Sequence, residues 1–236
     1  MNTTPYGQYC PLAMSAAFLC NKWTLLIFRE LLFGSTNFND ISRGVPRMSR
    51  TLLSNRLKEL VNIGLITRLE KQGTGQVDYV LTKPGKALES VVFSMASWGQ
   101  EWLETEPSLE NIDGSFLMWD IRRNVRIHED LPNLFIAHFL LIDMPENKSE
   151  YWLIFEHGQV DLCYVDRGFK PDVHIEVSAR ELTKIWMGWE DFNAAVEDHR
   201  LKFKGPKKYT EIAEYWLGCS TLAHIEIREK HLLVAE

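Results

Sequence analysis

The sequence predicts an α+β protein of two domains, the first spanning residues 1–104 and the second residues 114–236. A length of 236 residues exceeds the ~100–200 residues of a typical single domain. Residues 1–104 show mainly helical apolar spacing and one pair of strands, whereas strands and helices are mixed after residue 113. Residues 105–113 are polar and contain a proline, which indicates a linker.

Net charge changes sign between the two parts of the chain. The whole chain carries a formal charge of −6, which by itself disfavours binding to nucleic acid. Residues 1–104 hold 11 Lys/Arg and 8 Asp/Glu, a balance of +3, whereas the remaining residues hold 15 and 24, a balance of −9. Because charges are screened beyond about 8 Å at physiological salt, a basic first domain can bind DNA beside an acidic second domain.

Several classes of protein are disfavoured by what the sequence lacks. No apolar segment reaches the ~18–20 residues of a membrane-spanning helix, and the start has no secretion signal, so we expect a cytoplasmic protein without a membrane partner. The four cysteines form no Cys-x-x-Cys pair, and no metal site or disulfide is expected. Without His-x-x-x-His, Gly-x-Ser-x-Gly or phosphate-binding glycine motifs, we expect no enzyme, no catalytic residues and no cofactor.

The first predicted element is a helical region between Leu12 and Leu32. Apolar residues recur there at spacings of three and four, which places them on one face of a helix. Asn21 is a residue type that favours helix N-caps, so it is expected to begin a second helix. Gly34 should end that helix.

The next segment predicts a helix-turn-helix. Residues 37–43 are expected to form a short helix that ends at Gly44, and the following Val45-Pro46 pair requires extended backbone. Ser49 should then cap a second helix, in which leucines at three- and four-residue spacing form one apolar face. Two helices joined by so short a turn are typical of a helix-turn-helix.

The face of this second helix opposite its leucines is polar and suits the major groove of double-stranded DNA. Asparagine and arginine can form paired hydrogen bonds with base edges, while serine, threonine and lysine serve bases or phosphates. A solvated helix face would have the same composition. The candidate DNA-binding residues here are Arg47, Ser49, Arg50, Thr51, Ser54, Asn55, Arg56 and Lys58.

A predicted hairpin directly after this helix favours the DNA-binding interpretation. Residues 65–71 and 76–82 are rich in β-branched and apolar side chains, and glycines lie between them. A hairpin in this position is a wing, so the first domain is predicted to be a winged helix-turn-helix. Arg68, Lys71 and Gln72 are its candidate DNA contacts.

A last helix over residues 86–104 is predicted to contribute to a homodimer. Its apolar stripe comprises Leu88, Val91, Val92, Met95, Trp98 and Trp102. A small winged domain has little room to bury so much aromatic surface, so part of the stripe should pair with a second copy. A two-fold dimer would match a pseudo-palindromic operator.

Residues 10–103 resemble the HxlR family of bacterial transcriptional regulators. The similar segments are CP at 10–11, KWTLLIFREL at 22–31, FNDI at 38–41, MSRTLLSNRLKEL at 48–60, GLITR at 64–68 and YVLTKPGKAL at 79–88. The resemblance implies a dimer with the helix after Ser49 in the major groove. Two departures are Cys20-Asn21, where glycines are usual, and the wing sequence GTGQVDY, where proline is common.

The second domain is predicted to consist of helices on one antiparallel sheet. Residues 134–142 form an apolar run, a hairpin follows around His157-Gly158, and apolar residues alternate over 173–177. Ser178 and Glu181 have the spacing of a capping box for the next helix.

The segments DVHIEVSARELTKIW and EDHRLKFKGPKKY resemble the sterol-carrier-protein-like fold. This resemblance implies an effector domain with a cavity for an apolar small molecule. Candidate lining residues are Trp152, Phe155, Tyr164, Trp186, Met187, Trp189, Phe192 and Trp216. Aromatic residues of this kind more often fill a core, and that alternative stays open.

Cys10 is the one candidate reactive residue. In some HxlR-type proteins a cysteine at this Cys-Pro position senses oxidants or electrophiles, and a helix start stabilises a thiolate. A small buried apolar residue is the simpler interpretation.

The leading hypothesis is therefore a dimeric DNA-binding regulator whose second domain senses an apolar small molecule. The alternatives are a redox or electrophile sensor that acts through Cys10, and a lipid carrier that uses its first domain for dimerisation.

Overall fold

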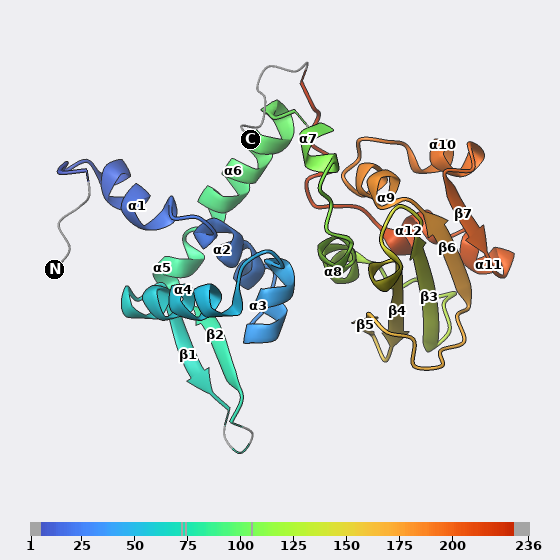
Figure 1. Ribbon diagram of the computed structural model, residues 1–236, viewed down its shortest axis with the longest axis horizontal. Helices are drawn as coiled ribbons and strands as arrows, with labels where there is room; N and C mark the ends of the chain where they lie inside the picture. The colour runs from blue at the N-terminus through green and yellow to red at the C-terminus, as the bar shows by residue number, and fades with distance from the viewer. Residues whose placement is uncertain (1–5, 72, 74, 105, 229–236) are drawn as a thin grey trace. The chain divides into compact units, whose positions relative to one another are not determined.

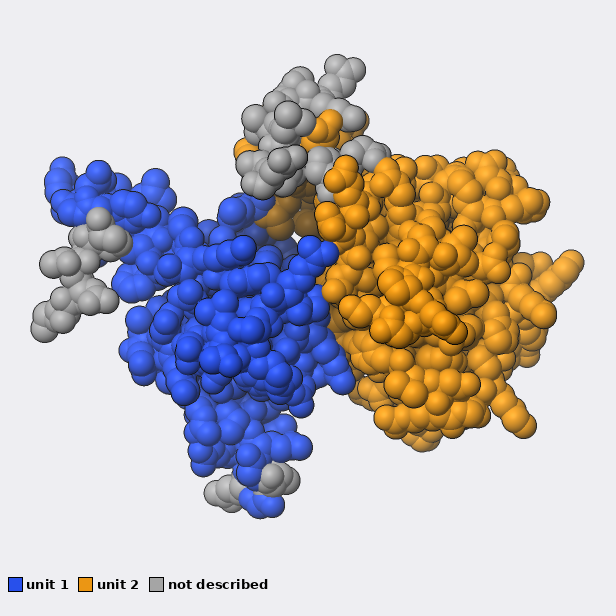
Figure 2. Space-filling view, in the orientation of Figure 1, with its two compact units in different colours: residues 1–95 blue, residues 96–236 orange. Residues whose placement is uncertain are grey.

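The computed structural model describes residues 6–71, 73, 75–104 and 106–228. The chain forms two compact units, residues 1–95 and 96–236, which Figure 2 shows in separate colours. The division falls inside helix α6 (Glu89–Trp102) rather than after residue 104. The segment expected to be a linker contains the short helix α7 (Glu106–Leu109), and its Leu109 is buried.

The first unit contains a helix-turn-helix followed by a two-stranded hairpin (Figure 1). Its elements are α1 (Pro11–Leu19), α2 (Thr24–Leu32), α3 (Phe38–Gly44), α4 (Arg50–Asn62), β1 (Ile66–Glu70), β2 (Val77–Leu81), α5 (Lys83–Lys86) and the first part of α6. The strands are antiparallel, with Ile66 opposite Leu81. Buried Phe28, Ile41, Leu53 and Leu57 join the helices in one core.

The break between α1 and α2 differs from the prediction that Asn21 caps the second helix. The N-cap of α2 is Trp23, which has a left-handed φ of 80° and makes no capping hydrogen bond. Asn21 instead closes α1, because its side-chain amide donates to the carbonyls of Ala17 and Phe18 at 3.1 and 3.3 Å. The Asn21 side chain therefore satisfies carbonyls at the end of α1 and does not cap α2.

Helices α1 and α2 have the length and apolar composition of a membrane-spanning segment only when they are taken together. No single helix among the described residues is long and apolar enough to cross a membrane. Together α1 and α2 pass the same test of length and composition, with a bend of 82° between them.

The second unit is a five-stranded sheet with helices. Its strands are β3 (Leu134–Leu141), β4 (Glu150–Glu156), β5 (Gln159–Cys163), β6 (Val173–Val177) and β7 (Leu201–Lys204), in the order β5-β4-β3-β6-β7. Its helices are α7, α8 (Gly114–Asn124), the 3₁₀ turn η1 (Glu146–Lys148), α9 (Ala179–Trp186), α10 (Phe192–Glu197), α11 (Lys207–Thr210) and α12 (Ala213–Leu217). The last part of α6 belongs to this unit.

The prediction of an antiparallel sheet is wrong at one pair of strands, because β3 and β6 are parallel. The β4–β5 hairpin occupies one side of β3, and β5 runs in the same direction as β3. Residues 164–172 therefore return along the sheet before β6 can pair with the free side of β3. This return gives β6 the direction of β3, whereas a hairpin connection would have reversed it.

Helices α8, α9 and α12 pack on one face of this sheet (Figure 1). Phe135 lies at the centre of the core, with ring centroids 5.3 Å from Phe155 and 5.5 Å from Trp216. Two of the buried tryptophans of the helices have satisfied indole N–H groups: Trp186 donates to Asp120 at 2.9 Å, and Trp216 donates to the carbonyl of Tyr209 at 3.0 Å. These two indoles are therefore buried without leaving a polar atom unsatisfied.

Candidate DNA interface and a cavity in the second unit

The polar face of α4 is held outward by its apolar face and its cap. The Ser49 hydroxyl accepts a hydrogen bond from the amide of Leu52 at 3.2 Å, which confirms the predicted N-cap. Leu53, Leu57 and Leu60 are at most 2% exposed. At about 100° per residue, this leaves the opposite side of the helix in solvent.

Six of the eight residues predicted on or before this helix are exposed, namely Arg47, Ser49, Arg50, Thr51, Asn55 and Lys58, while Ser54 and Arg56 are half-buried. Within the described part of the chain, Thr51, Asn55 and Lys58 form no hydrogen bond or ion pair through their side chains. Their donors and acceptors are available to an external partner.

The two arginines of α4 differ in their surroundings. Arg50 donates to the Asn39 side chain at 3.0 Å, and its guanidinium lies 4.6 Å from the ring centroid of Phe38. Both contacts come from α3, so they fix Arg50 at the junction of the two helices. Arg56 pairs with Glu59 at 2.5 Å, and its side chain is only 18% exposed. Arg56 therefore has less of its surface available than the neighbouring predicted contacts.

The basic residues of the wing are paired with acids of the same hairpin. Arg68 lies 2.5 Å from Glu70, and this hydrogen bond raises the pKa of the guanidinium. Lys71 lies 2.9 Å from Asp78. The third predicted wing contact, Gln72, lies outside the described residues. These ion pairs reduce the positive field that the hairpin presents.

The hairpin is also joined to the helix-turn-helix by a connection that the sequence did not indicate. The amide of Tyr79 donates to the carbonyl of Thr36 at 2.7 Å, and Asn37 forms a β-bridge with Asp78. The residues before α3 therefore add a short third segment to the sheet. This contact orients the wing relative to α3.

A buried ion pair fixes α2 to the end of α3. Glu30 is fully buried and accepts a hydrogen bond from Arg29 at 3.0 Å, while Arg29 also donates to the carbonyl of Gly44 at 2.6 Å. A Cβ on Gly44 would lie 1.8 Å from the Glu30 Cδ. The predicted helix end at Gly44 is confirmed, but glycine is needed there for close approach to Glu30.

Helix α1 of the first unit and helix α6, which belongs to both units, carry exposed apolar surface. Helix α1 buries none of its residues, and its Leu12 and Phe18 are 76% and 49% exposed. On α6, Val91, Met95 and Trp98 follow one another at four- and three-residue spacing and are 46%, 58% and 48% exposed. Such contiguous apolar surface is typical of an interface with another chain.

Cys10 lies at the N-cap of α1 and is exposed. Hydrogen bonds from the backbone amides of Ala13 and Leu12 lower the pKa of its thiol. The interpretation of Cys10 as a buried apolar residue is therefore wrong, since the sulfur faces solvent at a helix start.

The structure does not bring together the eight residues predicted to line a ligand pocket. Trp189 and Phe192 do line a common cavity. The other six pack elsewhere: Phe155, Trp186, Trp216 and Met187 belong to or adjoin the core, Tyr164 packs on Tyr151, and Trp152 lies on the opposite sheet face beside His138.

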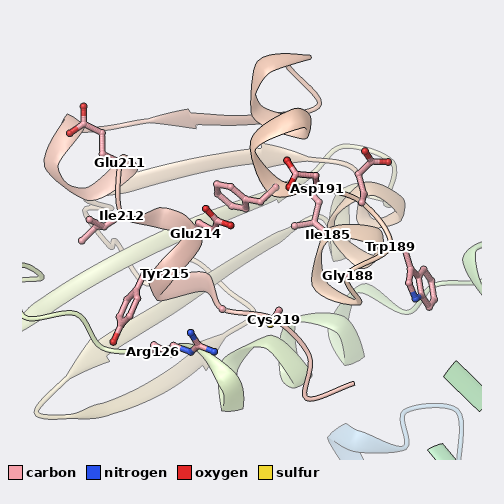
Figure 3. Close-up of a pocket in the computed structure, with 13 residues that line it drawn as sticks. Arg126, Ile185, Gly188, Trp189, Asp191, Glu211, Ile212, Glu214, Tyr215 and Cys219 are labelled. Carbon is pink, nitrogen blue, oxygen red and sulfur yellow. The ribbon is translucent and has the colours of Figure 1, made fainter. Parts of the chain in front are cut away.

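The cavity lined by Trp189 and Phe192 has a volume of about 790 Å³ and lies between the α9–α10 region and α12 (Figure 3). Its apolar wall includes Ile185 and Ile212. Charged side chains also line it, namely Glu190, Asp191, Glu211, Glu214 and Arg126. Among the described residues, no group of His, Cys, Asp and Glu side chains is placed to hold a metal ion.

The fold and the free polar face of α4 together define the first unit as a winged helix-turn-helix of the DNA-binding class. Residues 18–107 match the HxlR-like helix-turn-helix family. The chain belongs to this family.

Named relatives support this membership over the first part of the chain. The uncharacterized HTH-type transcriptional regulator YvaP of Bacillus subtilis is 34% identical over 100 residues, which are 42% of this chain and 93% of YvaP. The HTH-type transcriptional regulator YodB of the same organism is 35% identical over 97 residues, 40% of this chain and 87% of YodB. The crystal structure of diamide-treated YodB covers 39% of this chain and 93% of that chain, with 34% identity and a TM-score of 0.34.

Proposed function

We propose that the protein is a transcriptional regulator that binds double-stranded DNA as a homodimer and has no enzymatic activity. The observation that carries the proposal is the exposed face of α4, on which Thr51, Asn55 and Lys58 have no partner within the described residues. Their donors and acceptors suit base edges and phosphates in a major groove. The names of the relatives, which are HTH-type transcriptional regulators, support the same function.

The homodimer is proposed from the exposed apolar residues of α1 and α6. Met95 and Trp98 would lose contact with water if α6 packed against a second copy. Burial of apolar surface stabilises association by about 25 cal/mol per Å² before the costs of association are subtracted. Two recognition helices related by two-fold symmetry would then read a pseudo-palindromic operator.

DNA selection from a random pool, followed by gel retardation of the selected and scrambled sequences, tests the DNA-binding proposal. Asn55→Ala should weaken binding to the selected DNA by ~1–3 kcal/mol and relax its specificity. Lys58→Ala should weaken binding to the selected and the scrambled DNA alike. It should also lower the slope of log affinity against log salt concentration by about one. Lys170→Ala, which removes an exposed charge in the second unit, is the matched control. Equal affinity for selected and scrambled DNA would overturn the proposal.

The second unit is proposed to be an effector domain. Its cavity of about 790 Å³ falls within the ~300–1,000 Å³ of small-molecule sites. A sterol-carrier-like identity and a lipid-carrier function draw less support from this cavity, because charged carboxylates lose hydration against a neutral lipid. Transfer of a fluorescent lipid between vesicles would favour the carrier function instead.

A thiol sensor is a second candidate function, favoured by the exposure and lowered pKa of Cys10. A thiolate could add to a quinone, forming a carbon–sulfur bond while the quinone is reduced to the hydroquinone level. YodB structures are available in diamide-treated and quinone-bound forms. The test compares DNA binding before and after quinone treatment. Loss of binding in the native protein but not in Cys10→Ser supports sensing, and identical responses exclude it.

A further inference from the structure

We propose that the cavity beside α10 and α12 binds a lipophilic aromatic cation. This inference deepens the proposed effector role of the second unit and rests on it. The cavity combines aromatic and aliphatic walls with more negative than positive side chains, since four carboxylates and one guanidinium line it. Figure 3 shows the carboxylates of Asp191 and Glu214 on one side of the cavity and Arg126 on the other.

The four carboxylates are not all neutralised by neighbouring cations. Glu190 lies 3.2 Å from Arg200 and is paired. Asp191 accepts a hydrogen bond from the amide of Ala194 at 2.8 Å, as the N-cap of α10. These contacts orient the two carboxylates, but only the first supplies a full positive charge.

The two remaining carboxylates, on Glu211 and Glu214, have no cationic partner among the residues that the structure describes. Glu214 accepts a hydrogen bond from the neutral amide of Asn193 at 3.3 Å. Glu211 has no hydrogen bond or ion pair through its side chain within the described part of the chain. A positively charged ligand would therefore gain attraction that the protein itself does not satisfy.

Arg126 does not cancel this charge. Its guanidinium lies 5.9 Å from the ring centroid of Tyr215, another lining residue, and no ion pair joins it to the four carboxylates in the described structure. Arg126 therefore already places a cation against the Tyr215 ring. Aromatic faces attract cations within about 6 Å of the ring centroid.

The apolar lining residues favour a ligand with an aromatic body. Ile185 is 6% exposed, and Phe192 and Ile212 are half-buried partners of the core. A small hydrated cation would gain nothing from these side chains, whereas an aromatic body would bury apolar surface against them. An anion of the same shape would meet the carboxylates and be repelled.

A second cavity of about 490 Å³ extends the site. It shares Phe192, Glu211 and Glu214 with the first cavity, so the two unneutralised carboxylates lie on the wall common to both. The centre of a ligand that occupies both cavities would be next to these carboxylates. The positive charge is therefore expected near the middle of the ligand, with aromatic groups around it.

Tetraphenylphosphonium and tetraphenylborate provide a direct test, because they have the same shape and opposite charge. Titration calorimetry with the full chain should detect binding of the phosphonium and none of the borate. The double variant Glu211→Gln/Glu214→Gln should bind the phosphonium at least about tenfold more weakly. Glu129→Gln/Glu197→Gln removes two exposed carboxylates that do not line either cavity and should bind as the native protein does.

The proposal is overturned if the phosphonium does not bind, if the borate binds equally well, or if both double variants lose affinity alike. Circular dichroism melting of the two variants excludes unfolding as the cause of lost binding. Failure of the regulator function is seen separately, in gel retardation of selected DNA without any ligand. A protein that binds the phosphonium but no specific DNA would retain the cavity assignment and lose the effector role.

Discussion

Gly44→Ala is expected to destabilise the helix-turn-helix far more than an ordinary glycine substitution. The added Cβ would lie 1.8 Å from Cδ of Glu30 and 2.0 Å from its Oε2. Glu30 is fully buried and is hydrogen-bonded to Arg29 and, at 3.5 Å, to Ser35. The carboxylate would have to move away from these partners, since no carbon and oxygen atoms approach so closely without a bond.

Two effects contribute to the expected cost, and movement of Arg29 relieves most of the second. Overfilling a packed core costs ~1–3 kcal/mol. Separating a buried carboxylate from its partner costs ~3–5 kcal/mol when the charge stays buried. Because Arg29 is 25% exposed and can follow the carboxylate in part, we expect about 3 kcal/mol. In a domain of 60–100 residues that lowers the melting temperature by ~12–24 °C.

Differential scanning calorimetry of the full chain measures this shift. Gly99→Ala is the matched control: Gly99 lies inside α6, and an added Cβ would meet only Leu103 at 3.6 Å. Replacing a helical glycine in this way stabilises by ~0.5–1 kcal/mol. Adding Glu30→Ala to Gly44→Ala removes the clash, so the double variant should lose less than the sum of the single losses. A loss below about 1 kcal/mol for Gly44→Ala, or additive effects, would refute the reasoning.

Two further predictions concern association and pH. Trp98→Glu should convert the dimer to monomer in analytical ultracentrifugation. Leu69→Glu, which changes an equally exposed apolar site on the wing, should leave the dimer intact. The proposed interface is contradicted if both variants are dimers or if both are monomers. Burial lowers the pKa of His138 below its ordinary 6.5, although the carboxylates of Glu150 and Asp166 raise it. His138 therefore binds a proton more readily in the unfolded chain than in the folded chain. The free energy of unfolding should accordingly fall as the pH drops below 6.5. Melting curves of His138→Gln should show a smaller loss over that range, and an unchanged pH dependence would exclude His138.

Elements with a local signal in the sequence could be predicted. The leucine spacing of α4 and its Ser49 cap are properties of neighbouring residues, and the structure contains both. The alternation in β6 likewise predicts which of its side chains are buried. The exposed face of α4 follows from the same spacing, so the candidate DNA contacts on it could be named in advance.

Features that depend on distant residues could not be predicted. The direction of β6 depends on the path of residues 164–172, whereas alternation is the same in parallel and antiparallel strands. Gly44 was identified as a helix end, but its contact with Glu30 requires knowledge of how α2 packs on α3. Phe155 and Phe192 are the same residue type, yet one fills the core and the other lines a cavity.

The negative charge of the second part of the chain contributes to the proposed cation site. The net charge of −9 beyond residue 104 does more than keep the protein surface hydrated. Two of the acidic residues, Glu211 and Glu214, line both cavities beside aromatic side chains. DNA binding releases about 0.9 counterion per neutralised phosphate and weakens steeply with salt. A lipophilic cation gains much of its affinity from apolar burial, which salt does not screen. Raising the salt concentration should therefore abolish DNA binding first, and a cation of this class remains bound under conditions that have already released the DNA.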